Sequence, residues 1–278
     1  MKKTILITGC SSGIGHCVAK GLQKRGYRVF ATARKRGSVE KLLAEGLESF
    51  RLDLNDSNSI NFAFEEVLRR TDGELYAVFN NGAFGLPGAV EDLSRDALRA
   101  QFETNVFGWQ ELTNLAIPVM RRQGYGRIIQ NSSVLGFVCM PYRGAYNASK
   151  YAIEGLADTL RLELKGTNIY VSLIEPGPIT SQFRMNAVKA LEKHIDIEHS
   201  CHREKYQGVL KRLNKPGPAV PFTLPPEAVL KRVIDALESN PPKPRYYVTF
   251  PTYLFGFLKR ILSTRMLDAI LAKSGNSN

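Results

Sequence analysis

The chain has 278 residues, of which 44% are hydrophobic, so it can bury a sizeable core and is not expected to be disordered. Its formal net charge of +12 is compatible with nucleic acid, an anionic membrane surface or an anionic ligand as a partner. The basic residues are mostly scattered rather than gathered in one run, which weakens the case for nucleic acid.

Short apolar segments rich in β-branched residues alternate with longer helical patterns. Strands are expected at residues 3–8, 27–33, 48–53, 75–80, 127–132, 169–175 and 245–249. Helices are expected at about 13–25, 39–45, 57–70 with Ser57 as N-cap, 94–120 with a break near 105–108, 145–164 and 225–238. This alternation predicts right-handed β-α-β crossovers and a parallel sheet. We therefore expect one doubly wound α/β domain of the Rossmann type over residues 1–278, with seven parallel strands.

The N-terminal run MKKTILITGC is too short in its apolar part for a signal peptide and is better explained as the first strand. The sequence T-G-C-S-S-G-I-G follows at residues 8–15. Gly9, Gly13 and Gly15 would let the backbone turn tightly and approach a pyrophosphate at the start of a helix. The spacing differs from G-x-G-x-x-G, and an ordinary strand-to-helix turn is the alternative.

The second strand ends in the basic sequence Thr32-Ala33-Arg34-Lys35-Arg36. An NAD-binding protein usually carries an acidic residue here, which binds the ribose 2′-hydroxyl. A cationic cluster would instead attract a 2′-phosphate, and Arg34 could bind it with two hydrogen bonds. The sequence therefore favours NADP(H) over NAD, with a solvated basic turn as the alternative.

Polar and small residues also follow the other strands, in a definite order along the chain. The motifs are TGCSSGIG at 8–15, NNGA at 80–83, Asn105, Ser133, the Y-x-x-x-K of 146–150 and PGPI at 176–179. Each motif is weak alone, but the six in this order resemble the short-chain dehydrogenase/reductase family and are specific for it. The chain looks most like the bacterial NADP-dependent aldehyde reductases and the related retinol and 17β-hydroxysteroid dehydrogenases.

The resemblance implies a catalytic set of Asn105, Ser133, Tyr146 and Lys150. It implies cofactor contacts from Gly9, Ser11, Ser12, Gly13, Ile14, Gly15, Arg34, Asp53, Leu54, Asn80, Gly82, Ala83, Tyr146, Lys150, Pro176, Gly177, Ile179 and Ser181. Two departures stand out. The family usually reads N-N-A-G where this chain reads N-N-G-A, and it usually has Thr at the position of Ser181. The neighbouring Thr180 could make the nicotinamide contact instead.

Tyr146 and Lys150 lie four positions apart, so they share a helix face. A free tyrosine has a pKa of ~10, and a nearby ammonium together with a positive nicotinamide ring would lower it. Tyr146 would then act as general acid/base, and Ser133 would donate a hydrogen bond to the substrate oxygen. By resemblance, Lys150 also holds the nicotinamide ribose and Asn105 positions a water for proton relay. A chance pair on a helix surface is the alternative for Tyr146 and Lys150 alone.

We expect an oxidoreductase that transfers hydride between NADP(H) and a carbonyl or alcohol substrate, in the manner of an aldehyde reductase. An apolar aldehyde or ketone is favoured, because the region 183–223, the expected helical substrate lid, shows no obvious anion clamp. Apolar residues near the site either line the substrate pocket or belong to the core: Phe84, Leu86, Phe137, Met140 and Tyr142. The alternative function is a non-catalytic NADPH-binding regulator.

Residues 252–273 could form one amphipathic helix with the apolar stripe Leu254, Phe257, Leu258, Ile261, Leu262, Met266 and Ile270. We expect this helix to dock on the protein's own core. A membrane-surface contact or an oligomer contact is the alternative. No segment reaches the ~20 apolar residues of a membrane-spanning helix. A homo-oligomer is expected from the family resemblance only.

The chain contains four cysteines: Cys10, Cys17, Cys139 and Cys201. They form no C-x-x-C pair, and we interpret them as reduced thiols of a cytoplasmic protein. The nearest approach to a zinc-ligand grouping is Cys201-His202 with His194 and His199, in a polar stretch. We expect these residues to lie in a solvated loop, and we predict no metal.

Overall fold

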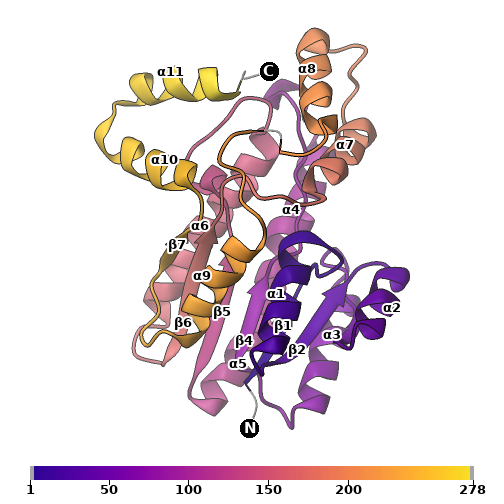
Figure 1. Ribbon diagram of the computed structural model, residues 1–278, viewed down its shortest axis with the longest axis vertical. Helices are drawn as coiled ribbons and strands as arrows, with labels where there is room; N and C mark the ends of the chain where they lie inside the picture. The colour runs from indigo at the N-terminus through magenta and orange to yellow at the C-terminus, as the bar shows by residue number, and fades with distance from the viewer. Residues whose placement is uncertain (1–2, 219, 276–278) are drawn as a thin grey trace.

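A seven-stranded parallel sheet forms the centre of the protein (Figure 1). The computed structural model describes residues 3–218 and 220–275. The strand order is β3-β2-β1-β4-β5-β6-β7, and every neighbouring pair is parallel. The strands are β1 Thr4–Ile7, β2 Arg28–Ala33, β3 Glu48–Arg51, β4 Ala77–Asn80, β5 Gly126–Asn131, β6 Ile169–Glu175 and β7 Arg245–Tyr247. The predicted fold class and strand count are confirmed.

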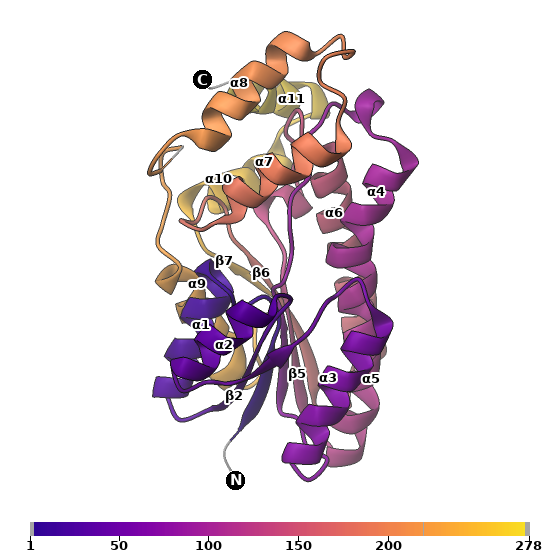
Figure 2. The ribbon, with the colours of Figure 1, turned by 90° about the vertical axis from the view of Figure 1, so that its right-hand side faces the viewer.

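Helices cover both faces of the sheet, as Figure 2 shows. One face carries α1 Gly13–Lys24, α2 Arg36–Ala44 and α9 Glu227–Glu238. The other carries α3 Ser57–Arg70, α4 Arg95–Phe102, α5 Gly108–Gln123 and α6 Gly144–Glu163. Four further helices lie beyond the carboxyl ends of the strands: α7 Phe183–His194, α8 Arg203–Asn214, α10 Phe250–Ile261 and α11 Thr264–Gly275.

The strands are apolar on both faces because each face packs on a helical layer. Leu6 and Val78 belong to the core shared with Trp109 of α5. The alternating neighbours Ile7 and Phe79 belong to the core on the opposite face, with α1 and α9. This alternation explains why the strands read as continuous apolar runs, and it fixes which way each residue after a strand can point.

Two helix boundaries have specific causes. The predicted break near 105–108 is a turn of π-helix, Glu103–Phe107, between α4 and α5. The predicted N-cap Ser57 is wrong by one residue. Asp56 has an extended backbone, and its carboxylate accepts a hydrogen bond of 3.2 Å from the backbone N–H of Ser59. A carboxylate there satisfies a free N–H and also suits the helix dipole.

The C-terminal segment forms two helices rather than one. Leu262 has ψ of 146°, which ends α10, and α11 begins at Thr264. This break divides the apolar stripe that was expected on one continuous helix between α10 and α11. Leu258 and Leu262 are partly buried, whereas Phe257 and Ile261 are more than half exposed. No helix of the described residues is both long and apolar enough to cross a membrane.

The helices α7 and α8 fall within the expected lid of 183–223, in which Ala219 lies outside the described residues. They pack on each other and on the loop after β4 through a small core that contains Leu86, Leu191 and Tyr206. The Tyr206 hydroxyl donates to Asp92 at 2.5 Å. This end of the molecule therefore has its own apolar core, beyond the edge of the sheet.

Gly108 should be essential for stability, because α5 begins against the backbone of the loop after β3. A Cβ at this position would lie 2.1 Å from the Leu54 carbonyl oxygen. We expect Gly108→Ala to lower the free energy of unfolding by about 1–3 kcal/mol, the usual cost of overpacking. The urea-unfolding midpoint of the variant, compared with that of the wild type, measures this loss of stability.

The matched control for this substitution is Gly155→Ala on α6, where an added Cβ meets nothing within 4 Å. Helix propensity alone should make that variant neutral or more stable by about 0.5–1 kcal/mol. Equal midpoints for the two variants would contradict the steric account.

Candidate active site

The loops after β1 and β4 meet backbone to backbone. Gly9 has a φ of +71°, and a Cβ there would lie 2.5 Å from the Gly82 Cα. A Cβ on Gly15 would lie 2.4 Å from the Gly9 carbonyl oxygen. The exchange of N-N-A-G to N-N-G-A therefore leaves a glycine at the position that approaches Gly9. The loop residues 8–15 form a compact turn at the start of α1, as the predicted pyrophosphate site requires.

Asn81 ties these loops together, and the sequence analysis did not include it among the site residues. Its backbone N–H donates to the Thr8 Oγ1 at 2.9 Å, and its Nδ2 donates to the Thr8 carbonyl at 2.9 Å. Its Oδ1 accepts a 2.9 Å hydrogen bond from the Asn131 side chain. The signal that could have identified Asn81 is its place as the second asparagine of the NNGA motif.

Asn80, which was expected to contact the cofactor, turns its side chain into the core. The side chain is fully buried, and its Nδ2 donates to the Thr113 hydroxyl at 3.1 Å. The indole N–H of Trp109, nearby on α5, donates to the Gly82 carbonyl at 2.8 Å. Any contact of Asn80 with a cofactor would therefore have to come from its main chain.

The structure brings Ser133, Tyr146 and Lys150 together at the end of β5. Ser133 follows this strand directly, and its hydroxyl accepts a 3.1 Å hydrogen bond from the Leu135 N–H. Tyr146 and Lys150 occupy successive turns of α6. The Lys150 Nζ donates to the Asn131 carbonyl at 2.7 Å. The lysine is thus held on the same strand that positions the serine.

Lys150 is almost completely buried, with its ammonium 4.3 Å from the centre of the Trp109 ring and 5.6 Å from that of Tyr146. Burial lowers the pKa of Lys150 to about 7, although the Glu154 carboxylate opposes this shift. The buried ammonium is therefore poised to exchange a proton near neutral pH.

In the protein alone, burial raises the pKa of Tyr146 to about 12, and a hydrogen bond with Ser133 acts in the opposite direction. Desolvation of the phenolate is the largest cause of this shift. The lowering predicted from Lys150 together with a nicotinamide ring concerns the cofactor-bound site and stays a prediction. Tyr146 is consequently a protonated phenol at neutral pH, the form that a proton donor needs.

Asn105 lies in the π-helical turn and clamps the loop after β4. Its Oδ1 accepts from the Phe84 N–H at 3.1 Å, and its Nδ2 donates to the Phe84 carbonyl at 2.9 Å. The Nδ2 also donates to the Ser149 hydroxyl at 3.2 Å, between Tyr146 and Lys150 on α6. Asn105 therefore joins the predicted catalytic helix to the loop, and its part in a water relay stays a prediction.

The remaining predicted cofactor residues lie at the same carboxyl edge. Arg34 is exposed after β2, and Arg51 donates to its carbonyl while pairing with Asp53 at 3.5 Å. Ser181 lies beside the glycine turn, since a Cβ on Gly13 would come within 2.9 Å of the Ser181 Cβ. Ile14 is in the first turn of α1, and the others are in the loops that follow β1, β3, β4 and β6: Ser11, Ser12, Leu54, Ala83, Pro176, Gly177 and Ile179.

Thr180 is exposed, and its N–H donates to the Leu224 carbonyl at 3.0 Å. Ser181 is therefore the better placed of the two candidates for a contact next to the glycine turn.

An aromatic side chain from the first turn of α7 covers Tyr146. The Phe183 ring lies edge-on to Tyr146, with 5.4 Å between their centres. A Cβ on Gly85 would lie 2.8 Å from the Phe183 Cζ, so glycine makes room for this ring. Leu86 is fully buried and belongs to the core, whereas Phe84, Phe137, Met140 and Tyr142 are partly buried. The surroundings of Tyr146 are thus predominantly apolar.

Next to Ser133 in the sequence, Ser132 joins a partly buried charge cluster that no sequence motif indicated. The Ser132 hydroxyl donates to the Glu154 carboxylate. Arg245 of β7 contacts Glu154 at 3.0 Å, Asp158 at 2.7 Å and Glu175 at 3.1 Å. Burial, reinforced by the neighbouring Glu154, raises the pKa of Glu175 to about 9. The acidic residues come from the consecutive elements α6 and β6, but Arg245 lies 70 residues beyond Glu175, so no local motif marks the cluster.

Two other features lie away from this site. Ligand atoms of Glu91, Cys201 and His202 come within 4.8 Å of one another, which could suit a metal ion. The His202 Nε2 and a Glu91 carboxylate oxygen already lie within hydrogen-bond distance of each other, at 2.5 Å. The two histidines that the sequence placed near this group, His194 and His199, are not part of it.

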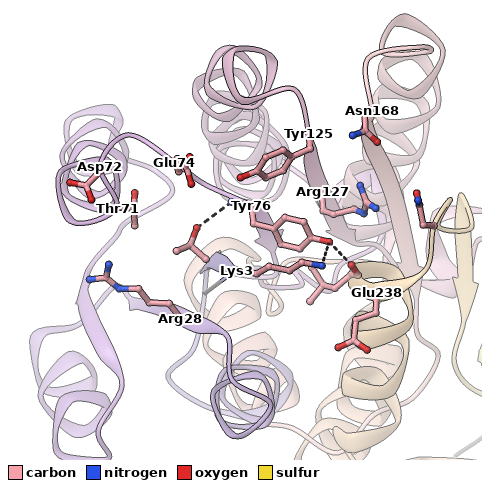
Figure 3. Close-up of a pocket in the computed structure, with 13 residues that line it drawn as sticks. Lys3, Arg28, Thr71, Asp72, Glu74, Tyr76, Tyr125, Arg127, Asn168 and Glu238 are labelled. Atoms are coloured by element: carbon pink, nitrogen blue, oxygen red, sulfur yellow. Dashed lines mark hydrogen bonds between the residues drawn. The ribbon is translucent and has the colours of Figure 1, made fainter. Parts of the chain in front are cut away.

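A cavity of about 670 Å³ opens at the opposite end of the sheet (Figure 3). It is lined by Lys3, Arg28 and Arg127 near the starts of β1, β2 and β5, together with acidic and aromatic residues. Ligands of such sheets bind at the carboxyl ends of the strands. This cavity is therefore separate from the candidate active site.

The fold and the site together define a Rossmann-type oxidoreductase, and the comparisons assign the family. The family model for short chain dehydrogenases matches residues 3–192, so the chain belongs to the short-chain dehydrogenase family. It is 42% identical to the uncharacterized oxidoreductase YbbO of Escherichia coli K12, over 98% of this chain and 94% of the relative. It is 32% identical to human 17-beta-hydroxysteroid dehydrogenase type 1, over 89% of this chain and 78% of that relative.

Solved structures agree with this assignment. A short-chain dehydrogenase from Streptomyces avermitilis matches with a TM-score of 0.77 at 26% identity, over 98% of this chain and 97% of that one. A variant of actinorhodin polyketide ketoreductase with NADPH matches with a TM-score of 0.73 at 26% identity, over 89% of this chain and 95% of that one.

The Arg245 cluster generates a pH dependence of stability. The pKa of Glu175 is raised on folding, so the folded protein keeps a proton that the unfolded chain releases above about pH 4.5. Glu175 therefore contributes a loss of stability as the pH rises from that value through about 9. We expect Glu175→Gln, which binds no proton in either state, to make urea-unfolding midpoints fall less between pH ~5 and pH ~8 than in the wild type.

Glu163→Gln is the control, because this glutamate is exposed on the same helix as Glu154. It should leave the wild-type pH profile unchanged. If Glu175→Gln also leaves it unchanged, the buried carboxyl does not hold a proton.

Proposed function

We propose that the protein is an NADP(H)-dependent oxidoreductase that interconverts apolar carbonyl compounds and their alcohols. The observation that carries this proposal is the grouping of Ser133, Tyr146 and Lys150 beside the glycine turn. The turn fits a dinucleotide: Gly13 has a φ of +57°, and any Cβ on it would fill the space against Ser181. The NADPH in the solved ketoreductase structure supports the choice of cofactor class.

When bound, NADPH supplies the hydride, and the protein's own residues manage the proton. In the reducing direction Tyr146, a protonated phenol at neutral pH, donates its proton to the substrate oxygen as general acid. Ser133 donates a hydrogen bond to the same oxygen and stabilises the developing charge. Lys150, with its pKa near 7, restores the proton of Tyr146. Asn105 holds the loop and helix between which a relay water would lie.

The cofactor preference rests on Arg34. This side chain is exposed at the end of β2, and the nearby Asp53 pairs with Arg51. Among the described residues no carboxylate pairs with Arg34, so its guanidinium can bind a 2′-phosphate. The proposal is accordingly for NADP(H) rather than NAD(H).

An apolar substrate is supported by what surrounds Tyr146. Phe183 covers the phenol, and Phe84 and Met140 lie nearby on the loops after β4 and β5. The similarity to a 17-beta-hydroxysteroid dehydrogenase points to the same substrate class of apolar ketones and aldehydes. Helices α7 and α8 would act as the substrate lid. A cytoplasmic homo-oligomer is part of this proposal by analogy with the family.

The first test replaces the proton donor. Tyr146→Phe should lower kcat by at least about a hundredfold, because general acid catalysis is removed. The Kd for NADPH should change little. Loss of NADPH absorbance measures turnover with a panel of aldehydes, ketones, retinal and steroids, and NADPH fluorescence measures binding.

Tyr151→Phe is the matched control, because Tyr151 lies on the same helix with 39% of its surface exposed. It should retain wild-type turnover. Substantial activity of Tyr146→Phe would exclude Tyr146 as the donor. Tight NADPH binding by the wild type without turnover of any compound would favour the non-catalytic regulator.

The second test concerns cofactor choice. Arg34→Ala should raise the KM for NADPH about tenfold or more, because a hydrogen-bonded charge pair with the 2′-phosphate is lost. The KM for NADH should stay within about twofold, since NADH has no such group. Initial rates with each cofactor measure both constants. A wild-type preference for NADH, or equal effects on the two cofactors, would contradict the assignment.

A further inference from the structure

Helix α10 is apolar on the side that faces the protein and also on the side that faces solvent. On the inner side, Phe255 and Leu258 pack against Val134, Leu135 and Val138 in the loop after Ser133. The expected docking on the protein's own core is therefore present. A helix that needed only this contact would carry polar residues on its other side.

The outer side of α10 carries large apolar side chains instead. Their exposed fractions are 55% for Phe250, 49% for Tyr253, 38% for Leu254, 60% for Phe257 and 58% for Ile261. These positions follow helical spacing, so they form one stripe. Phe222 extends the stripe, with its ring centre 4.9 Å from that of Phe250 and 57% of its surface exposed. We call these six residues the outer face; a contiguous patch of this kind marks an interaction surface.

A cationic pocket adjoins the outer face. It has a volume of about 260 Å³ and is lined by Arg232, Lys243, Arg245, Tyr246, Tyr247, Tyr253 and Arg260. Tyr253 belongs to both features, and Arg260 lies two helical turns further along the same edge of α10. No carboxylate is among the lining residues.

The charges in this pocket are only partly neutralised. Arg245 is held by Glu154, Asp158 and the protonated Glu175, and Arg232 pairs with Asp235 at 3.1 Å. Within residues 3–218 and 220–275, neither Lys243 nor Arg260 forms a salt bridge. The pocket therefore presents cations and tyrosine hydroxyls that suit a phosphate group.

We propose that the outer face and this pocket together dock the protein on an anionic phospholipid bilayer. The apolar stripe would enter the boundary between headgroups and acyl chains, and the pocket would receive a headgroup phosphate. A second copy of the chain fits less well. A two-fold contact through this stripe would bring the Arg260 edges of both copies to one interface, in a protein with a net charge of +12. An anionic surface instead complements that charge.

If the outer face of α10 docks on a bilayer, only the inner side of this helix would separate the bilayer from the loop after Ser133. The inner side of α10 touches Val134 and Leu135, which follow Ser133 directly. Tyr247 of the pocket stacks on Phe137 of the same loop, with 5.7 Å between ring centres. A membrane-dissolved apolar compound would thus meet the protein close to Tyr146. The docking itself does not depend on the proposed activity.

Vesicle co-sedimentation with the full-length chain tests the proposal. We expect binding to vesicles of phosphatidylcholine mixed with phosphatidylglycerol, and much weaker binding to phosphatidylcholine alone. Phe257→Ser should weaken binding to mixed vesicles about tenfold, through loss of buried apolar area. Arg260→Gln should weaken it about fivefold, the effect of one basic residue near an anionic surface.

Matched controls are Phe62→Ser on α3, where Phe62 is 64% exposed, and Arg122→Gln, an exposed arginine of α5. Both should bind like the wild type. Unchanged binding of Phe257→Ser would overturn the proposal. So would a light-scattering result in which Phe257→Ser dissociates a dimer while vesicle binding persists. A thermal shift with inorganic phosphate that Arg260→Gln abolishes, without any vesicle binding, would identify a soluble-anion site instead.

Discussion

The contact of two backbones at Gly9 and Gly82 is the constraint on which the candidate site depends. The loops after β1 and β4 meet where the strand order reverses, and a Cβ on Gly9 would leave only 2.5 Å to the Gly82 Cα. This approach sets the start of α1, and thereby the N–H groups that face a pyrophosphate. It also places the Gly82 carbonyl where the Trp109 indole binds it, which fixes the start of α5.

One chain of hydrogen bonds connects the glycine turn with Lys150, the predicted catalytic lysine. Asn81 binds the Thr8 carbonyl, Asn131 binds Asn81, and Lys150 donates to the Asn131 carbonyl. Each link is a buried or partly buried polar group, and an unpaired one would be costly. The position of the Lys150 ammonium therefore depends on the geometry of the glycine turn, on the far side of two strands.

Local patterns predicted the strands, the order of the motifs and the family, because strand-to-helix alternation and loop motifs are contiguous in sequence. They did not predict the inward turn of the Asn80 side chain, because both faces of β4 are covered and local sequence does not choose between them. They also missed the grouping of Arg245 with Glu154 and Glu175, which depends on the pairing of β6 with β7. They also gave no sign that burial raises the pKa of Tyr146 in the protein alone, because burial depends on the whole surrounding structure.

The turn from Ser181 to Phe183 joins the two ligand regions in a single short segment. Ser181 abuts Gly13, the Ser181 hydroxyl accepts from the Phe183 N–H at 3.3 Å, and the Phe183 ring rests on Tyr146. A dinucleotide that displaced Ser181 would also move the Phe183 ring, because the two residues are only two positions apart. The glycine turn and the aromatic cover of Tyr146 are therefore mechanically linked through this one segment.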